Sequence, residues 1–177
     1  MNDVGLKRGT VELREHNPKW KEIFEEEKQM LLGHFPGQIL EVSHGGSTAI
    51  PKMPAKPIID MFAVVPALRV AEDMRSELEK LGYHYRGEEG VSGRILYAKG
   101  EEEKRTHHLQ LVEREGDQWK NHLLIKNYYL QHPEVAEEYA LLKQELAVKY
   151  PENRSAYSKG KNEFVQAVIA KAKTNEV

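Results

Sequence analysis

The chain has 177 residues, of which 31% are charged and 40% hydrophobic, and its formal net charge is −2, a composition typical of a soluble globular protein. The length predicts one domain, or a small sheet domain with a helical appendage. The absence of cysteine excludes disulfides, thiolate metal sites and cysteine nucleophiles, and the near-neutral charge argues against nucleic acid as a partner. No apolar run is long enough for a membrane span and residues 1–10 lack the apolar core of a signal peptide, so we expect a cytoplasmic protein with no membrane partner.

The first half of the chain alternates predicted helices and strands. Asn17-Pro18 is typical of a helix start, and apolar residues at helical spacing continue this helix until Pro36-Gly37. The alternation over residues 38–44 predicts a strand. The nearly continuous apolar run 57–65 predicts a central strand that is covered on both faces. Residues 68–81 are expected to form a helix that ends at Gly82.

The second half begins with short strands and ends with helices. Strands are predicted at 83–86, 93–99 and 106–113, with hairpin loops rich in glycine and glutamate between them. Helices are predicted at 118–131, 133–150 and 154–173, separated by His132-Pro133 and Tyr150-Pro151. Strands gathered before helices indicate an α+β fold. We expect one domain, with an α/β core over about 11–115 and a helical part over about 116–173.

The loop after the first predicted strand is the strongest candidate for a binding site. It contains Gly46, Ser47 and Thr48, and such a loop lets the backbone approach a ligand and directs N–H groups at a phosphate. The alternative is an ordinary tight turn. The next strand carries Asp60, and an isolated carboxylate in a buried strand is costly unless it meets a metal, a cation or several donors. Together they suit a nucleotidyltransferase, in which the loop holds phosphates and the acid holds the bridging metal.

The chain resembles GrpB domains, which are similar to divergent members of the polymerase-β-type nucleotidyltransferase superfamily. The resemblance rests first on His44, Gly46-Ser47-Thr48-Ala49, Pro51 and Ala55-Lys56-Pro57-Ile58-Ile59-Asp60. It continues in Thr106-His107-His108-Leu109, Trp119, His122-Leu123-Leu124, His132-Pro133, Tyr139, Leu142-Lys143 and Tyr157-x-x-Gly160-Lys161. It implies a mixed β-sheet core, C-terminal helices that close over one end of the sheet, and Mg²⁺ or Mn²⁺ as a cofactor.

The sequence departs from this superfamily at the expected metal site. Two carboxylates two residues apart usually share the metals there, but Phe62 takes the second position, and one carboxylate cannot hold two divalent ions. His44, Asp60 and His108 could instead form a metal site of two histidines and one carboxylate. We expect Asp60 and His108 to be the catalytic residues. The alternative is a set of buried polar residues that bond to one another without a metal.

The last predicted helix offers cations for an anionic ligand. Lys161 lies on an apolar stripe that includes Tyr157, and Arg154 precedes it by about two turns. A lysine on such a stripe must reach solvent or meet an anion, so these three residues are expected to bind phosphate, together with Lys56 before the Asp60 strand. The alternatives are a lysine that covers the core with its stem or pairs with Glu27, and a solvated Lys56.

Two functions are consistent with these residues. The first is a nucleotidyltransferase-like enzyme that binds a nucleotide or another phosphorylated small molecule and transfers a nucleotidyl group to a small acceptor. The second is an inactive binding or folding-assistance module. GrpB domains occur fused to dephospho-coenzyme A kinase, so the resemblance implies a partner of that kind, which would act on this chain in trans because the chain contains no Walker-type loop.

Overall fold

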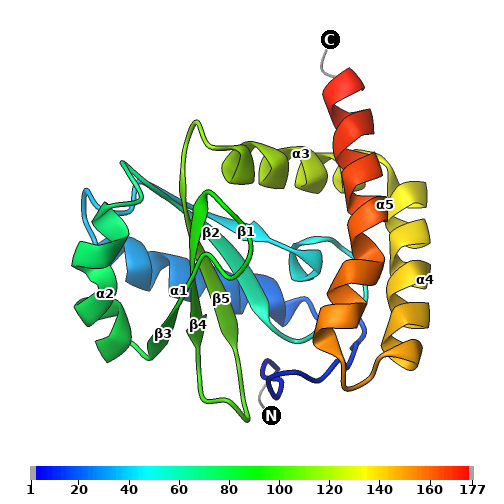
Figure 1. The fold of residues 1–177 in the computed structure, drawn as a ribbon, viewed down its shortest axis with the longest axis horizontal. Helices are drawn as coiled ribbons and strands as arrows, with labels where there is room; N and C mark the ends of the chain where they lie inside the picture. Colours follow the sequence, from blue (N-terminus) through cyan, green and yellow to red (C-terminus); the bar gives the residue numbers. More distant parts are fainter. Residues whose placement is uncertain (1–2, 176–177) are drawn as a thin grey trace.

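The computed structural model describes residues 3–175 as a mixed β-sheet with helices on both faces (Figure 1). The elements are α1 (Lys19–His34), β1 (Glu41–Gly45), η1 (Ser47–Ala49), β2 (Ile59–Val65), α2 (Val70–Lys80), β3 (Tyr83–Gly87), β4 (Arg94–Lys99), β5 (His107–Glu113), α3 (Asp117–Gln131), α4 (Pro133–Lys149) and α5 (Arg154–Asn175). Every predicted helix and strand is present, with small differences at the ends, and the α+β class is confirmed. The Asn17 carboxamide oxygen accepts the N–H of Lys19 at 3.0 Å, which explains the helix start.

The five strands form one sheet in the order β1-β2-β5-β4-β3. Only β2 and β5 run parallel, and the other neighbouring pairs are antiparallel. The register places Asp60 opposite Gly45 on one side and opposite His108 on the other. These pairs bring the glycine-rich loop after β1, the carboxylate of β2 and the histidine of β5 together at the same end of these neighbouring strands.

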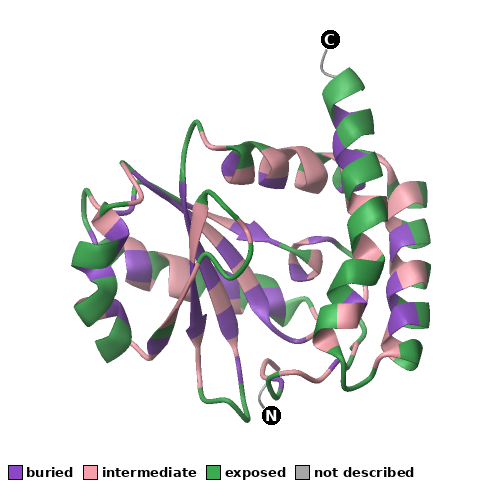
Figure 2. Cartoon of the chain, viewed as in Figure 1, coloured by how far each residue is buried: buried purple, intermediate pink, exposed green. Residues whose placement is uncertain are grey.

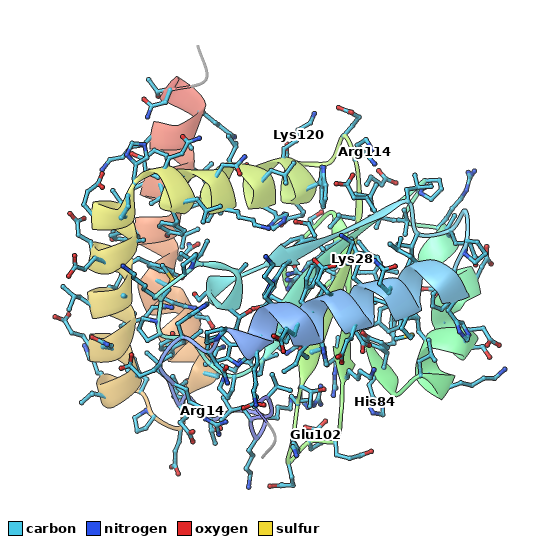
Figure 3. The ribbon with its side chains drawn as sticks, turned by 180° about the vertical axis from the view of Figure 1, so that it is seen from behind. Arg14, Lys28, His84, Glu102, Arg114 and Lys120 are labelled. Atoms are coloured by element: carbon cyan, nitrogen blue, oxygen red, sulfur yellow. The ribbon has the colours of Figure 1, made fainter. Side chains whose placement is uncertain are left out.

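One face of the sheet packs against α1 and α2 and forms the main hydrophobic core. Alternate residues of β2 and β5, among them Met61 and Leu109, point to this face and meet Trp20, Leu31 and Leu78. Figure 2 shows that buried residues dominate the strands, whereas the outer sides of the helices are exposed. Seen from the α1 side in Figure 3, α1 lies across the sheet and Glu102 lies at the tip of the β4–β5 hairpin.

Glu27 on α1 is part of this core rather than of a ligand site. Its carboxylate accepts hydrogen bonds from Lys99 Nζ and from the Tyr83 hydroxyl, each at 2.6 Å. The alternative in which Glu27 pairs with Lys161 is therefore wrong. Lys99 and Tyr83 reach Glu27 from neighbouring strands, a pairing that the residue spacing along the chain could not reveal.

The other face of the sheet is only partly covered. Trp119 of α3 packs against Val64 and Val112 at one end. Helices α4 and α5 pack against each other beyond the opposite end, and a Cβ on Gly160 would lie 2.5 Å from a methyl of Leu146, so glycine allows this close approach. Between these helices and the sheet the chain leaves an open cleft. Within residues 3–175 no helix has the length and apolar character of a membrane span.

Candidate functional site

The cleft has a volume of about 700 Å³ and lies between the open sheet face and the helices α4 and α5. Almost all of the predicted site residues line it, although they come from distant parts of the chain. These residues are Gly46, Ser47, Thr48, Lys56, Asp60, His108, Arg154, Tyr157 and Lys161. Of the predicted set, only His44 is not part of the cleft lining.

Asp60 lies on the cleft floor, with 32% of its side chain exposed. Its Oδ1 is 3.2 Å from His108 Nδ1. Burial raises the pKa of Asp60, but the hydrogen bond with His108 and the charges of Lys56 and Arg154 outweigh burial and leave this pKa below its usual value. Burial also lowers the pKa of His108. Near neutral pH the pair is therefore a carboxylate and a neutral imidazole that donates its Nδ1–H to the carboxylate.

Gly46 is required at the turn above Asp60 for two reasons. Its φ is +62°, a conformation that side chains other than glycine rarely adopt. A Cβ at this position would also lie 2.4 Å from Oδ2 of Asp60. The loop and the carboxylate therefore touch directly, which explains why Gly46 and Asp60 occur together in the motif.

The loop itself is a short 3₁₀ turn over Ser47–Ala49. Ala49 N–H bonds to Gly46 O at 3.3 Å, and Ile50 N–H bonds to Ser47 O at 3.1 Å. Within residues 3–175, the N–H groups of Gly46, Ser47 and Thr48 have no acceptor among the loop and turn hydrogen bonds. The loop therefore keeps hydrogen-bond donors beside the carboxylate and the cations of the cleft.

Three of the predicted cations line the cleft without forming a salt bridge among the described residues. Lys56, Arg154 and Lys161 form no salt bridge within residues 3–175. Burial lowers the pKa of all three, neighbouring cations of the cleft add to this effect and Asp60 opposes it, and the pKa of Lys161 falls to about 8. The Nζ atoms of Lys56 and Lys161 lie 5.4 and 4.4 Å from the centre of the Tyr157 ring, whose π face partly compensates for the missing anion.

Lys143 of α4 is a fourth cation, which we did not predict as a site residue. It is only 1% exposed, and its Nζ donates to Ser47 Oγ at 2.8 Å and to Pro54 O. Burial and the charge of Lys161 lower its pKa to about 7. The sequence carries a signal for it, because Lys143 occupies the apolar stripe of α4 between Tyr139 and Leu146.

Arginines at the cleft rim were also missed. Arg8, Arg86 and Arg105 converge on Glu102 of the β4–β5 hairpin, and this lowers the pKa of Glu102 to about 2 through the hydrogen bond with Arg86 and the neighbouring charges. Arg94 donates to Gln110 Oε1 at 2.7 Å on the floor. These residues lie on separate elements, so only the tertiary structure brings them together.

His44 does not join Asp60 and His108. The antiparallel register pairs it with Met61, so its ring points to the opposite sheet face, where it stacks on Phe24 and contacts Thr48 Oγ1 at 2.8 Å. Burial lowers its pKa to about 4. The expected site of two histidines and one carboxylate is therefore not assembled, and residues 3–175 contain no cluster of three His, Cys, Asp or Glu side chains that could hold a metal.

The donors on the cleft floor do not fit a two-metal centre. A second metal ion would need further oxygen ligands from the positions next to Asp60 on this face, which are Phe62 and Gln110. The Phe62 side chain has no oxygen, and the Gln110 oxygen already accepts a hydrogen bond from Arg94. Mg²⁺ commonly binds to one or two carboxylates together with ligand phosphates. Asp60 could therefore share a single Mg²⁺ or Mn²⁺ with a phosphorylated ligand, but two ions would lack ligands.

Comparison with known proteins agrees with the motif. The chain is 39% identical over 163 residues to the UPF0157 protein YqkA of Bacillus subtilis, covering 92% of this chain but only 47% of YqkA, so it spans about half of that relative. It is 35% identical to the glutamate-rich protein GrpB of Alkalihalophilus pseudofirmus, over 94% of this chain and 98% of that protein.

A solved structure shows the same fold. The crystal structure of the conserved protein GrpB from Enterococcus faecalis superposes with a TM-score of 0.86 at 36% identity, over 93% of this chain and 99% of that chain. The family model described as GrpB protein matches residues 10–171. Sequence motif, family model and fold therefore agree, and the chain belongs to the GrpB protein family.

Proposed function

We propose that this protein binds a nucleotide, or another small molecule with adjacent phosphates, in the cleft. One observation supports this above all others: among residues 3–175, Lys56, Lys143, Arg154 and Lys161 line the cleft around the Ser47 loop without a salt bridge, and the single carboxylate of Asp60 lies near all four. Burying unpaired charges costs free energy, and a polyanion would offset that cost. A single carboxylate would satisfy only one or two of these cations, whereas two or three adjacent phosphates match the group.

The charge of the whole cleft supports the same ligand class. Eight Lys or Arg side chains line it, against the two acids Asp60 and Glu89. The rim arginines are held by Glu102, so they add a fixed positive edge, and the four unpaired cations near Ser47 supply the direct contacts. The net charge of the chain is −2, so this cleft is a local concentration of positive charge that favours anionic small molecules.

Transfer of a nucleotidyl group to a small acceptor is the finer part of the proposal. Asp60 and His108 would be the catalytic residues, because they are the acidic and basic groups in mutual contact on the cleft floor. The cations would neutralise charge on the phosphates, with or without one Mg²⁺ or Mn²⁺ held by Asp60. Phe62 in the second carboxylate position favours a second candidate, a binding module that acts in trans with an enzyme such as dephospho-coenzyme A kinase.

A thermal-shift screen tests the binding proposal. ATP and dephospho-coenzyme A are each added with and without Mg²⁺ or Mn²⁺. A ligand at 100 times its Kd should stabilise the fold by about 2.7 kcal/mol. Arg154→Gln should abolish much of this stabilisation, whereas Arg69→Gln, at an exposed position just before α2, should leave it unchanged. If no phosphorylated compound stabilises the protein at millimolar concentration, the proposal is wrong.

Release of pyrophosphate separates the two finer alternatives. A transferase supplied with ATP, a metal and its acceptor should release pyrophosphate, and Asp60→Asn should stop this release while ATP still binds. A binding module should bind ATP or dephospho-coenzyme A with no pyrophosphate release under any condition of the screen.

A further inference from the structure

A second, smaller pocket adjoins the cleft at Asp60. We propose that this side pocket, which has a volume of about 260 Å³ and opens beside α3, is a separate binding site for a compact apolar carboxylic acid. The inference extends the proposed function, because it gives the protein a second ligand next to the phosphorylated one. The two pockets share Gly46, Ser47, Asp60, Gln110 and Tyr139, so molecules bound in both would meet over the Asp60 carboxylate.

The walls of the side pocket differ in kind from those of the cleft. Aliphatic side chains come from Ile50, Met53, Ile125 and Val165, and aromatic rings line other parts. Among these rings, Phe62 stacks on His122 with centroids 4.1 Å apart and a tilt of 10°, which presents a flat, rigid wall. Apolar walls with few polar groups favour an apolar molecule and do not favour phosphates.

One cation gives the expected ligand its chemistry, and its attraction must outweigh repulsion from the Asp60 carboxylate, which also lines the side pocket. Lys126 is the only lysine or arginine that lines the side pocket, and it forms no salt bridge within residues 3–175. Burial and the charge of the neighbouring Lys28 lower the pKa of Lys126, and Glu25, which pairs with Lys28 at 3.9 Å, offsets this only in part. A single half-buried cation next to apolar walls is complementary to a molecule with one carboxylate and an apolar body.

The aromatic wall includes an unsatisfied polar group. The hydroxyl of Tyr129 is buried and has no hydrogen-bond partner among the described residues. A buried hydroxyl without a partner is unfavourable, but its oxygen is not exposed to the pocket, so a ligand would reach it only if the Tyr129 ring shifted. The side pocket therefore offers a cation beside apolar walls, in a volume suited to one aromatic or branched aliphatic acid.

The size of the cleft argues for two separate ligands rather than one that fills both pockets. About 700 Å³ is within the range that encloses a complete drug-sized ligand. A nucleotide can therefore fit wholly within the cleft, which leaves the side pocket for a second molecule. On this argument the occupants should bind simultaneously rather than compete.

Fluorine NMR with 4-fluorobenzoate tests the inference. We expect binding with a Kd in the millimolar range, weaker binding of the uncharged 4-fluorobenzamide, and retention of 4-fluorobenzoate when ATP is saturating. Val165→Phe should fill the pocket and weaken binding at least tenfold, whereas Val148→Phe, at a position that is 84% exposed on α4, should have no effect. Lys126→Gln should weaken binding about fivefold, and the exposed Lys120→Gln on the same helix should not.

Three outcomes would overturn the inference: no binding of 4-fluorobenzoate, equal binding to wild type and to both Val165→Phe and Lys126→Gln, or displacement by ATP. The last would assign the side pocket to the nucleotide itself. The test remains informative if Val165→Phe does not fold, because Lys126→Gln changes only a half-buried side chain. If ATP fails to bind the wild type, the phosphate proposal fails, while the fluorine titration still decides the side pocket.

Discussion

Replacing Lys161 by methionine separates a ligand-binding charge from a structural one. The Lys161 ammonium lies 4.4 Å from the centre of the Tyr157 ring and has no carboxylate partner within residues 3–175. Glu27, the acid that could have paired with it, is occupied by Lys99 and Tyr83. Methionine keeps much of the apolar stem and removes the charge. We therefore expect Lys161→Met to fold well and to bind polyanions poorly.

The pKa of Lys161 gives the size of the effect on stability. It falls from 10.5 to about 8, and each tenfold change in protonation corresponds to about 1.4 kcal/mol, so at pH 7 the charged form is disfavoured in the fold by about 3 kcal/mol. Loss of the contact with Tyr157 offsets about 1 kcal/mol. The variant should therefore be about 2 kcal/mol more stable at pH 7.

The stability difference should depend on pH with a defined sign. Between pH 8 and 10.5 the unfolded chain binds more protons at Lys161 than the folded chain does, so the stability of the wild type rises with pH. Lys161→Met lacks this titration. The stability advantage of the variant over the wild type should therefore shrink above pH 8 and be nearly absent by about pH 9.5.

Urea denaturation and calorimetric titration with ATP measure the two effects. We expect about 10- to 100-fold weaker ATP binding, which corresponds to the loss of one charged hydrogen bond of about 1.5–3 kcal/mol. Lys159→Met, at an exposed position of the same helix, is the matched control and should change neither quantity. Unchanged ATP affinity together with a loss of about 3–5 kcal/mol would show instead that Lys161 belongs to a buried ion pair.

Three further predictions concern the loop, the core and the pH dependence of binding. Gly46→Ala should abolish ATP binding and lower the free energy of unfolding in urea by about 2–4 kcal/mol, because its Cβ would lie 2.4 Å from the Asp60 carboxylate. The control Gly37→Ala has a similar positive φ but would meet no atom within 4 Å, so it should cost only about 1 kcal/mol. Glu27→Gln should cost about 2–3 kcal/mol because it leaves Lys99 without its partner, and it should leave ATP affinity unchanged in the same titration. Affinity for trimetaphosphate, whose charge is constant in this range, should fall as pH rises from 6.5 to 9, because the pKa of Lys143 is about 7 and its charge is lost. Calorimetry in buffers of different ionisation enthalpy should detect proton uptake on binding. An affinity that does not depend on pH would contradict this.

The fold was predictable because its local signals agree with one another. The apolar run of β2, the helical spacing of α1 and the breaks at His132-Pro133 and Tyr150-Pro151 each have one simple interpretation. The strand period of two placed His108 and Gln110 on one face, whereas the register of β2 against β5 brings Asp60 beside His108. Only element ends differed, as with the first strand, which was expected at 38–44 and is observed at Glu41–Gly45.

The candidate site was harder to predict because its geometry depends on strand register and on helix docking. The register of β1 against β2 sends His44 to the core face, although it lies two residues from Gly46. Lys143 reaches Ser47 across 96 positions of sequence. A lysine on an apolar stripe was interpreted as a site residue in α5, and the same reasoning applied to α4 would have found Lys143.

The cleft connects protonation, stability and binding through the same side chains. Lys143 and Lys161 have pKa values of about 7 and about 8, so near neutral pH each is close to exchanging a proton with solvent. A polyanion favours their charged forms and raises both pKa values, and linkage then requires that binding takes up protons. The cost of burying the amines falls on the ligand-free protein, so removing either charge should stabilise the empty cleft and weaken the complex. Removing a side chain that only supports the fold would destabilise the ligand-free protein and the complex alike. Opposite effects on the stability of the free protein and on ligand affinity therefore identify a cation that serves anion binding.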